Sequence, residues 1–205
     1  MAAVLALAAL LGAPATWRAG LAQPVVDVRG NTAGARLPAT LPPSEQKAAD
    51  DAFQQATRLA RAGERDRALQ VLESALRGLP RDARLRFLRG VLLAESGRRA
   101  DAVDAFESLV ADFPELPEPY NNLAVLHAAG GDLDKARAAL ESAIRALPEY
   151  ALAHENLGDV YLRMAARAYE LALRVAPTSR SAQDKLTLAR ELVQRVTAAP
   201  ATAAR

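Results

Sequence analysis

The chain has 205 residues and a nearly balanced charge, with 26 Lys and Arg against 24 Asp and Glu, and no segment forms the basic patch typical of nucleic-acid binding. It contains no cysteine, which excludes a disulfide framework, a thiolate metal site, a cysteine nucleophile and a lipoprotein anchor. Apolar residues make up 51% of the chain and aromatic residues only 4%, an alanine-rich composition that suits closely packed helices.

An apolar run opens the chain over residues 2–15. It is too short to span about 30 Å of hydrocarbon as a helix. It fits the apolar region of a secretory signal peptide, although no Lys or Arg precedes it. We therefore expect a signal peptide over residues 1–22, and a periplasmic or secreted protein with no membrane span after cleavage. The alternatives are an unstructured alanine-rich tail and a single-pass anchor.

Residues 23–43 contain four prolines, two glycines and little periodicity. This composition is typical of a disordered linker. Ser44 follows directly, and serine is a favourable helix N-cap because its hydroxyl accepts a hydrogen bond from the first turn. Regular structure is therefore expected from residue 44.

Three sets of residues recur at a spacing of 34 positions from here on. They predict stacked helical hairpins: a glycine that takes the left-handed conformation after the first helix, an alanine where two helices approach closely, and a proline after the second helix. Small residues at Gly90 and Ala124 keep the same step. The three sets are Gly63, Gly97 and Gly131; Ala68, Ala102 and Ala136; and Pro80, Pro114 and Pro148.

This pattern resembles the tetratricopeptide repeat family over about residues 47–177. The resemblance implies an all-α, right-handed α-solenoid of about four helical hairpins, with a domain over residues 44–177 and repeats at about 49–82, 83–116, 117–150 and 151–177. The best-matching unit carries Tyr120, Leu123, Ala124, Ala136, Leu140, Ala143 and Pro148.

The fourth unit is shorter than the others. The step from Pro148 to Pro177 falls five short of the repeat period, and the missing positions lie where the other units have their turn. Between Tyr161 and Ala165 nothing breaks a helix, and one apolar stripe runs through. We expect one continuous helix over 152–175; the alternative is a tight, distorted turn around 163–166. The second half of a continuous helix needs another cover, which is either the closing helix or, in a homodimer through 152–175, a partner chain.

A closing helix is expected over residues 178–196. Ser179 is its N-cap, and Leu186, Ala189, Leu192, Val193 and Val196 share one face that would cover the open end of the solenoid. Residues 197–205 form an alanine-rich tail that we expect to be disordered.

We expect no enzymatic activity, no metal and no cofactor. His127 and His154 occupy repeat positions usually filled by buried aromatic residues, and they lack the spacing or acidic partners of a metal site. Gly130 and Gly131 form a turn between helices, so they are not a phosphate-binding loop. Asp132 starts a helix, and most other charges alternate in sign on solvated helix faces.

Binding remains as the function. In the resembling family, the first helices of the hairpins line a concave face that holds a partner peptide, often with an asparagine at the positions of Asn122 and Asn156. Asparagine is also common there for purely structural reasons. Basic residues of a carboxylate clamp are mostly absent, so we expect a ligand with apolar and basic character. The candidate contacts are Arg84, Phe87, Val91, Glu118, Asn121, Asn122, Val125, Glu155, Asn156 and Asp159.

The sequence thus predicts a protein–protein interaction adaptor in the bacterial cell envelope, whose partner is a protein or peptide and not a nucleic acid. Two alternatives stay open. One is a homo-oligomerising structural module. The other is an accessory factor that presents substrates to an envelope assembly enzyme.

Overall fold

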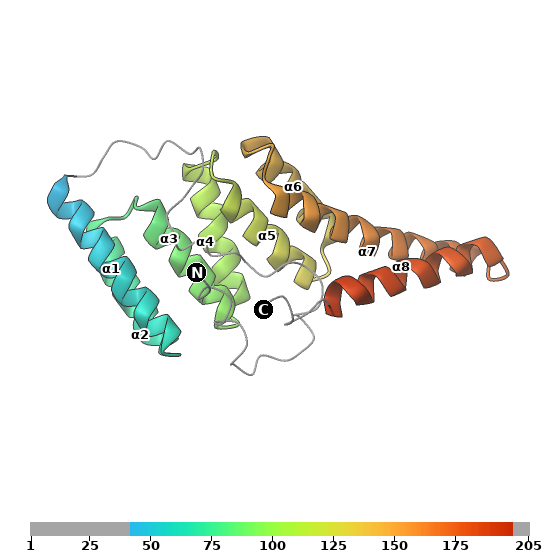
Figure 1. The fold of residues 1–205 in the computed structure, drawn as a ribbon, viewed down its shortest axis with the longest axis horizontal. Coiled ribbons are helices and arrows are strands. Elements are labelled where there is room, and N and C mark those ends of the chain that lie inside the picture. Colours follow the sequence, from blue (N-terminus) through green and yellow to red (C-terminus); the bar gives the residue numbers. More distant parts are fainter. Residues whose placement is uncertain (1–41, 199–205) are drawn as a thin grey trace, which may run out of the picture.

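The computed structural model describes residues 42–198 (Figure 1). The predicted signal peptide, nearly all of the predicted linker and residues 199–205 lie outside this range. The described part contains helices and no strand. The helices are α1 (Pro43–Arg61), α2 (Arg65–Gly78), α3 (Ala83–Glu95), α4 (Arg99–Asp112), α5 (Pro117–Ala129), α6 (Leu133–Ala146), α7 (Ala151–Val175) and α8 (Arg180–Ala198).

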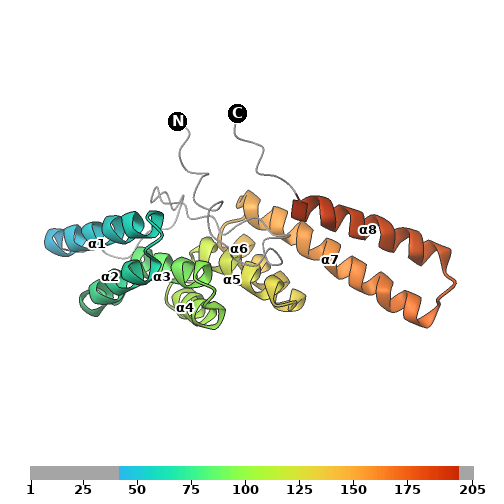
Figure 2. The ribbon, with the colours of Figure 1, turned by 90° about the horizontal axis from the view of Figure 1, so that it is seen from below.

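Consecutive helices pair into hairpins that stack along one direction (Figures 1 and 2). The pairs α1/α2, α3/α4 and α5/α6 correspond to the first three of the four expected repeats, and the predicted all-α solenoid is confirmed. The turn glycines behave as expected: Gly63, Gly97 and Gly131 have φ values of 82°, 75° and 82°. A side chain is strained at such angles, which is why glycine recurs there.

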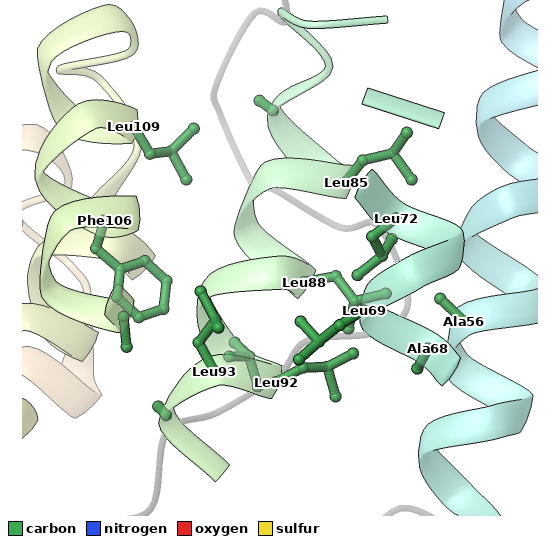
Figure 3. Packing of buried hydrophobic residues seen from close by; sticks show 14 of the residues in the cluster. Ala56, Ala68, Leu69, Leu72, Leu85, Leu88, Leu92, Leu93, Phe106 and Leu109 are labelled. Atoms are coloured by element: carbon green, nitrogen blue, oxygen red, sulfur yellow. The ribbon is translucent and has the colours of Figure 1, made fainter. Parts of the chain in front are cut away.

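The core lies between the two layers of helices (Figure 3). The periodic alanines Ala68, Ala102 and Ala136 are fully buried, as their role in close helix packing requires. Gly90 lies against the buried ring of Phe106, and a Cβ atom there would come within 2.7 Å of its Cε1 atom. The repeat therefore uses glycine at this position to admit a large aromatic side chain from α4.

Two of the three residues that were predicted to start a helix do cap one. Asp132 caps α6, its Oδ1 atom accepting a hydrogen bond from the backbone N–H of Lys135 at 3.1 Å. Ser179 caps α8, its Oγ atom accepting from the N–H of Ala182 at 3.3 Å. The assignment of Ser44 as an N-cap is wrong, because α1 already begins at Pro43. Proline suits the first helical position, since it has the required φ and no N–H to leave unpaired.

Helix α7 runs without interruption for 25 residues, so the predicted continuous helix is confirmed and the alternative turn at 163–166 does not form. Its second half projects from the end of the solenoid, with α8 lying antiparallel along it (Figures 1 and 2). Leu186 and Ala189 of α8 are buried, and Val193 and Val196 are half-buried. Leu192 is exposed, so its predicted place on the covered face is wrong.

Candidate partner-binding face

The predicted binding residues lie on α3, α5 and α7, the first helices of their pairs. Four of them, Val91, Asn121, Asn122 and Asn156, are enclosed by the chain itself. Their contact with a partner stays a prediction, but the surface now open to a partner is smaller than the predicted set. We call this surface the first-helix face; it consists of Arg84, Phe87, Glu118, Val125, Glu155 and Asp159.

The three asparagines of the predicted set form hydrogen bonds inside the fold, and two of them join helices. The Nδ2 atom of Asn156 donates a hydrogen bond to Oδ1 of Asn121 at 2.7 Å, and both side chains are fully buried. This bond joins α7 to α5. Asn122 donates from Nδ2 to the backbone oxygen of Glu118 at 2.9 Å, within α5. Burying an amide costs free energy unless it is hydrogen-bonded. These bonds give the asparagines a role inside the fold, although the Nδ2 atom of Asn121 has no partner within residues 42–198.

The basic end of the first-helix face is neutralised within the chain. Arg84 forms an ion pair with Asp50 of α1 at 2.8 Å and a longer one with Asp82 at 3.9 Å. Asp82 also caps α3, accepting a hydrogen bond from the N–H of Leu85. Sequence reasoning missed Asp50, yet a signal was present: Asp50, Arg84 and Glu118 follow one another at the repeat period, so they occupy neighbouring positions along the stacked first helices.

The other end of the face is acidic. Glu155 is exposed and Asp159 is half-buried. Burial raises the pKa of Asp159, the negative charge of Glu155 raises it further, and the positive charge of Arg163 opposes both. Burial also lowers the pKa of Arg163. Two carboxylates near each other with one partly buried guanidinium leave this end attractive to a cation.

Helix α8 limits the face at this end. Its residues Val193 and Val196 line one small pocket together with Asp159, Leu162 and Arg163. Asp159 therefore lies beside the C-terminal helix, which covers part of its surroundings. Sequence reasoning also missed Arg163, which is one helical turn after Asp159 and so shares its side of α7.

The first-helix face also carries two apolar side chains. The ring of Phe87 packs in a tilted arrangement against Phe106, with the ring centroids 5.7 Å apart, and remains half-buried. Val125 of α5 is half-buried as well. The first helices thus carry two half-buried apolar side chains together with the carboxylates of Glu118, Glu155 and Asp159, a composition that suits an apolar, basic segment.

The two histidines do not share one environment. His127 is half-buried, and burial lowers its pKa. His154 is exposed, with its Nε2 atom 2.8 Å from the backbone oxygen of Pro148, so its predicted place in the core is wrong. Residues 42–198 hold no group of three or more His, Cys, Asp or Glu side chains placed to bind a metal. Among the helices of this range, none is both long and apolar enough to cross a membrane.

Comparison with known proteins gives concordant matches. Two sequence profiles described as tetratricopeptide repeat match residues 53–117 and 93–157, which together span about half of the chain. No curated protein matches the sequence.

Solved structures with a similar fold include a MamA protein, with a TM-score of 0.54, 22% sequence identity, and coverage of 74% of this chain and 85% of that chain. A second is TTC0263, described as a thermophilic TPR protein in Thermus thermophilus, with a TM-score of 0.51, 24% identity, and coverage of 74% and 84%. A third is residues 41 to the end of MamA from Desulfovibrio magneticus RS-1, with a TM-score of 0.50, 22% identity, and coverage of 70% and 74%. At these identities the likeness concerns the fold.

Proposed function

Because the chain belongs to the tetratricopeptide repeat family, we propose that it is a non-enzymatic adaptor that binds a partner protein on its first-helix face. Repeats of this family indicate a protein–protein interaction scaffold in general. The observation that carries the finer proposal is that the first helices bear the carboxylates of Glu118, Glu155 and Asp159 together with the half-buried apolar side chains of Phe87 and Val125. A partner segment with apolar residues and Lys or Arg complements this surface in both polarity and charge.

Charge reversal tests the assignment of the face. The double variant Glu155→Lys with Asp159→Lys replaces the acidic end by a basic one, and its capture of the wild-type partner from an envelope fraction should fall by about tenfold or more. The matched control is Asp104→Lys with Glu107→Lys, which changes the net charge equally at exposed positions of α4, a second helix. Equal capture by both variants would refute the assignment, provided that circular dichroism shows both to be folded.

We also propose that the adaptor works in the bacterial cell envelope, after removal of a signal peptide over residues 1–22. The support is the apolar run at residues 2–15, followed by small residues at plausible cleavage positions. N-terminal sequencing of the natural product tests this directly. A mature chain that still begins within the apolar run contradicts it.

A second candidate function is homo-oligomerisation through the long helix, residues 152–175. It is favoured by the exposed apolar side chains that α7 and α8 carry beyond the solenoid. An accessory factor that presents substrates to an envelope assembly enzyme differs from a general adaptor only in its partner. The identity of the captured protein distinguishes these two functions.

A further inference from the structure

The exposed large apolar side chains of the described residues all lie on α7 and α8. Their exposed fractions are 49% for Tyr161, 48% for Leu171, 87% for Val175, 58% for Leu188 and 37% for Leu192. Within residues 42–198, helices α1 to α6 expose no large apolar side chain to this extent. The part of the chain that has lost its repeat turn is thus the part with uncovered apolar surface.

On α7 these side chains form one stripe. At 100° per residue, Tyr161, Ala165, Ala168, Ala172 and Val175 fall within a sector about 80° wide, and Leu171 lies about 40° outside it. The side of α7 toward α8 is a different one, where Leu162 lines a pocket with Val193 and Val196. It carries four half-buried residues, Leu162, Ala166, Tyr169 and Leu173. Every member of the stripe is exposed except Ala165, which is half-buried.

Leu188 and Leu192 of α8 continue the stripe of α7 on the same side of the pair. The hydrogen bond from Arg190 to Glu170 at 2.8 Å, and the pocket that Val193 shares with Leu162, place this part of α8 alongside the stripe of α7. In an antiparallel pair, residues displaced in the same rotational sense from the shared seam point to the same side. The two helices therefore present a single apolar face, which we call the hairpin face.

The hairpin face remains open down to the solenoid. Ala153, Asn156 and Val160 are buried on the other side of α7, where the helix joins the body. His154 and Gly158 continue the line of the stripe toward the body, and both are exposed. A second helical pair therefore fits against this face without displacing the hairpins of the solenoid.

We propose that the hairpin face binds the same face of a second copy of this chain, in a two-fold symmetric, antiparallel four-helix bundle centred on Ala168. This deepens the second candidate function above and names its surface and register. Four-helix bundles bury the apolar sides of two helical hairpins in this way, and a two-fold interface uses one patch twice.

The distribution of side-chain sizes fits this register. Tyr161 and Val175 lie at equal distances along the chain on either side of Ala168, so the two-fold axis places the Tyr161 of one copy level with the Val175 of the other. The positions between them are small: Ala165, Ala168 and Ala172. Small residues at the crossing point allow two helices to approach closely, and the larger ends then pack around the crossing.

An antiparallel arrangement also suits the two solenoids. With tips pointing in opposite directions, the tip of each copy reaches the base of the other and the solenoids lie at opposite ends of the bundle. A parallel arrangement would bring the two solenoids to the same end.

Light scattering of the full chain tests the proposal. We expect wild-type protein at micromolar concentration to have twice the 21.8 kDa mass of one chain. Ala168→Glu should raise the dissociation constant of the dimer by about 100-fold or more, since it buries two unpaired carboxylates at the axis. The control Arg167→Glu, an exposed neighbour that points away from the hairpin face, should remain dimeric.

A mixture of Ala168→Glu and Ala168→Lys chains should restore the dimer, because residue 168 then meets an opposite charge across the axis. A monomeric wild type, or a dimer that Ala168→Glu leaves intact, overturns the proposal. If the mixed chains remain monomeric, the register centred on Ala168 is wrong. Partner capture by monomeric Ala168→Glu distinguishes the two sites: if it persists, the first-helix face acts on its own, whatever the fate of the dimer.

Discussion

The α3/α4 hairpin and the α7/α8 pair show what one missing turn does to a repeat. In α4, Ala102, Phe106 and Leu109 are fully buried. The corresponding pattern in α7 is Ala165, Tyr169 and Ala172, of which two are half-buried and the last is exposed. Both segments have the same apolar spacing. The difference is that α4 folds back on α3, whereas the second half of α7 continues straight on.

In this solenoid, the burial of an apolar side chain therefore depends on the turn that folds its helix back, as well as on the apolar pattern. Without the turn, α8 becomes the neighbour of α7, and two helices alone cannot cover each other on more than one side. The apolar surface that a repeat would hide remains available for another contact.

Restoring the turn should produce the largest effect. Inserting Gly-Asp-Leu-Asp-Lys after Arg163 copies residues 131–135 and returns the spacing from Pro148 to Pro177 to the repeat period. We expect a regular fourth hairpin with unchanged helical content by circular dichroism. The hairpin face should then be lost, and with it any assembly through that face, as seen by light scattering. An insertion variant that keeps the assembly state of the wild type would show that the deletion has no structural consequence.

The aromatic residues at matching positions should differ in their contribution to stability. Phe106→Ala should cost about 3–5 kcal/mol of unfolding free energy, because it opens a cavity in a closed core. Tyr169→Ala should cost only about 1–2 kcal/mol, because water fills the space that a half-buried ring leaves. Urea denaturation measures both values. Similar losses would contradict the view that the second half of α7 lacks a closed core.

Two glycines at one repeat position should respond with opposite signs. Gly90 and Gly158 are separated by two full repeat periods. Alanine at 90 places its Cβ atom 2.7 Å from the Phe106 ring and should cost about 1–3 kcal/mol. Alanine at 158 meets no atom within 4 Å and should stabilise α7 by about 0.5–1 kcal/mol, since glycine is unfavourable within a helix. Thermal unfolding of both variants decides the signs.

The repeat signals in the sequence predicted most of this fold. Glycines with positive φ, buried alanines and terminal prolines are local requirements, and they can be recognised wherever their spacing is kept. The continuous helix was also predictable, because between Tyr161 and Ala165 no residue breaks a helix. His154 shows the limit: its repeat position predicted burial, but the neighbour that would bury it is absent.

The candidate site was less predictable because side-chain partners depend on distances between helices. A family position for Asn156 gives no sign that Asn121, one helix pair earlier, takes up its amide in the core. In the same way, a family position for Arg84 gives no sign that Asp50 forms an ion pair with it. Such pairs can be recognised only by comparing residues about one repeat apart on neighbouring first helices, because a single repeat does not contain both partners.

The smallest expected effect concerns Asp159, where α8 replaces the covering that a regular repeat would provide. Its pKa is raised in the folded chain by burial and by Glu155, so its ionised form disfavours folding. The stability that is present below the unfolded pKa is therefore lost as pH rises through the folded pKa. Asp159→Asn should thus stabilise the protein near neutral pH, by less than about 1 kcal/mol because the side chain remains partly solvated. The gain should vanish below about pH 3.9, where the carboxyl is protonated in both states. Thermal unfolding between about pH 3 and pH 7 measures the gain, and Glu155→Gln, which removes only the neighbouring charge, should give a smaller gain of the same sign. A gain that is independent of pH would show that the ionised carboxylate is not the cause.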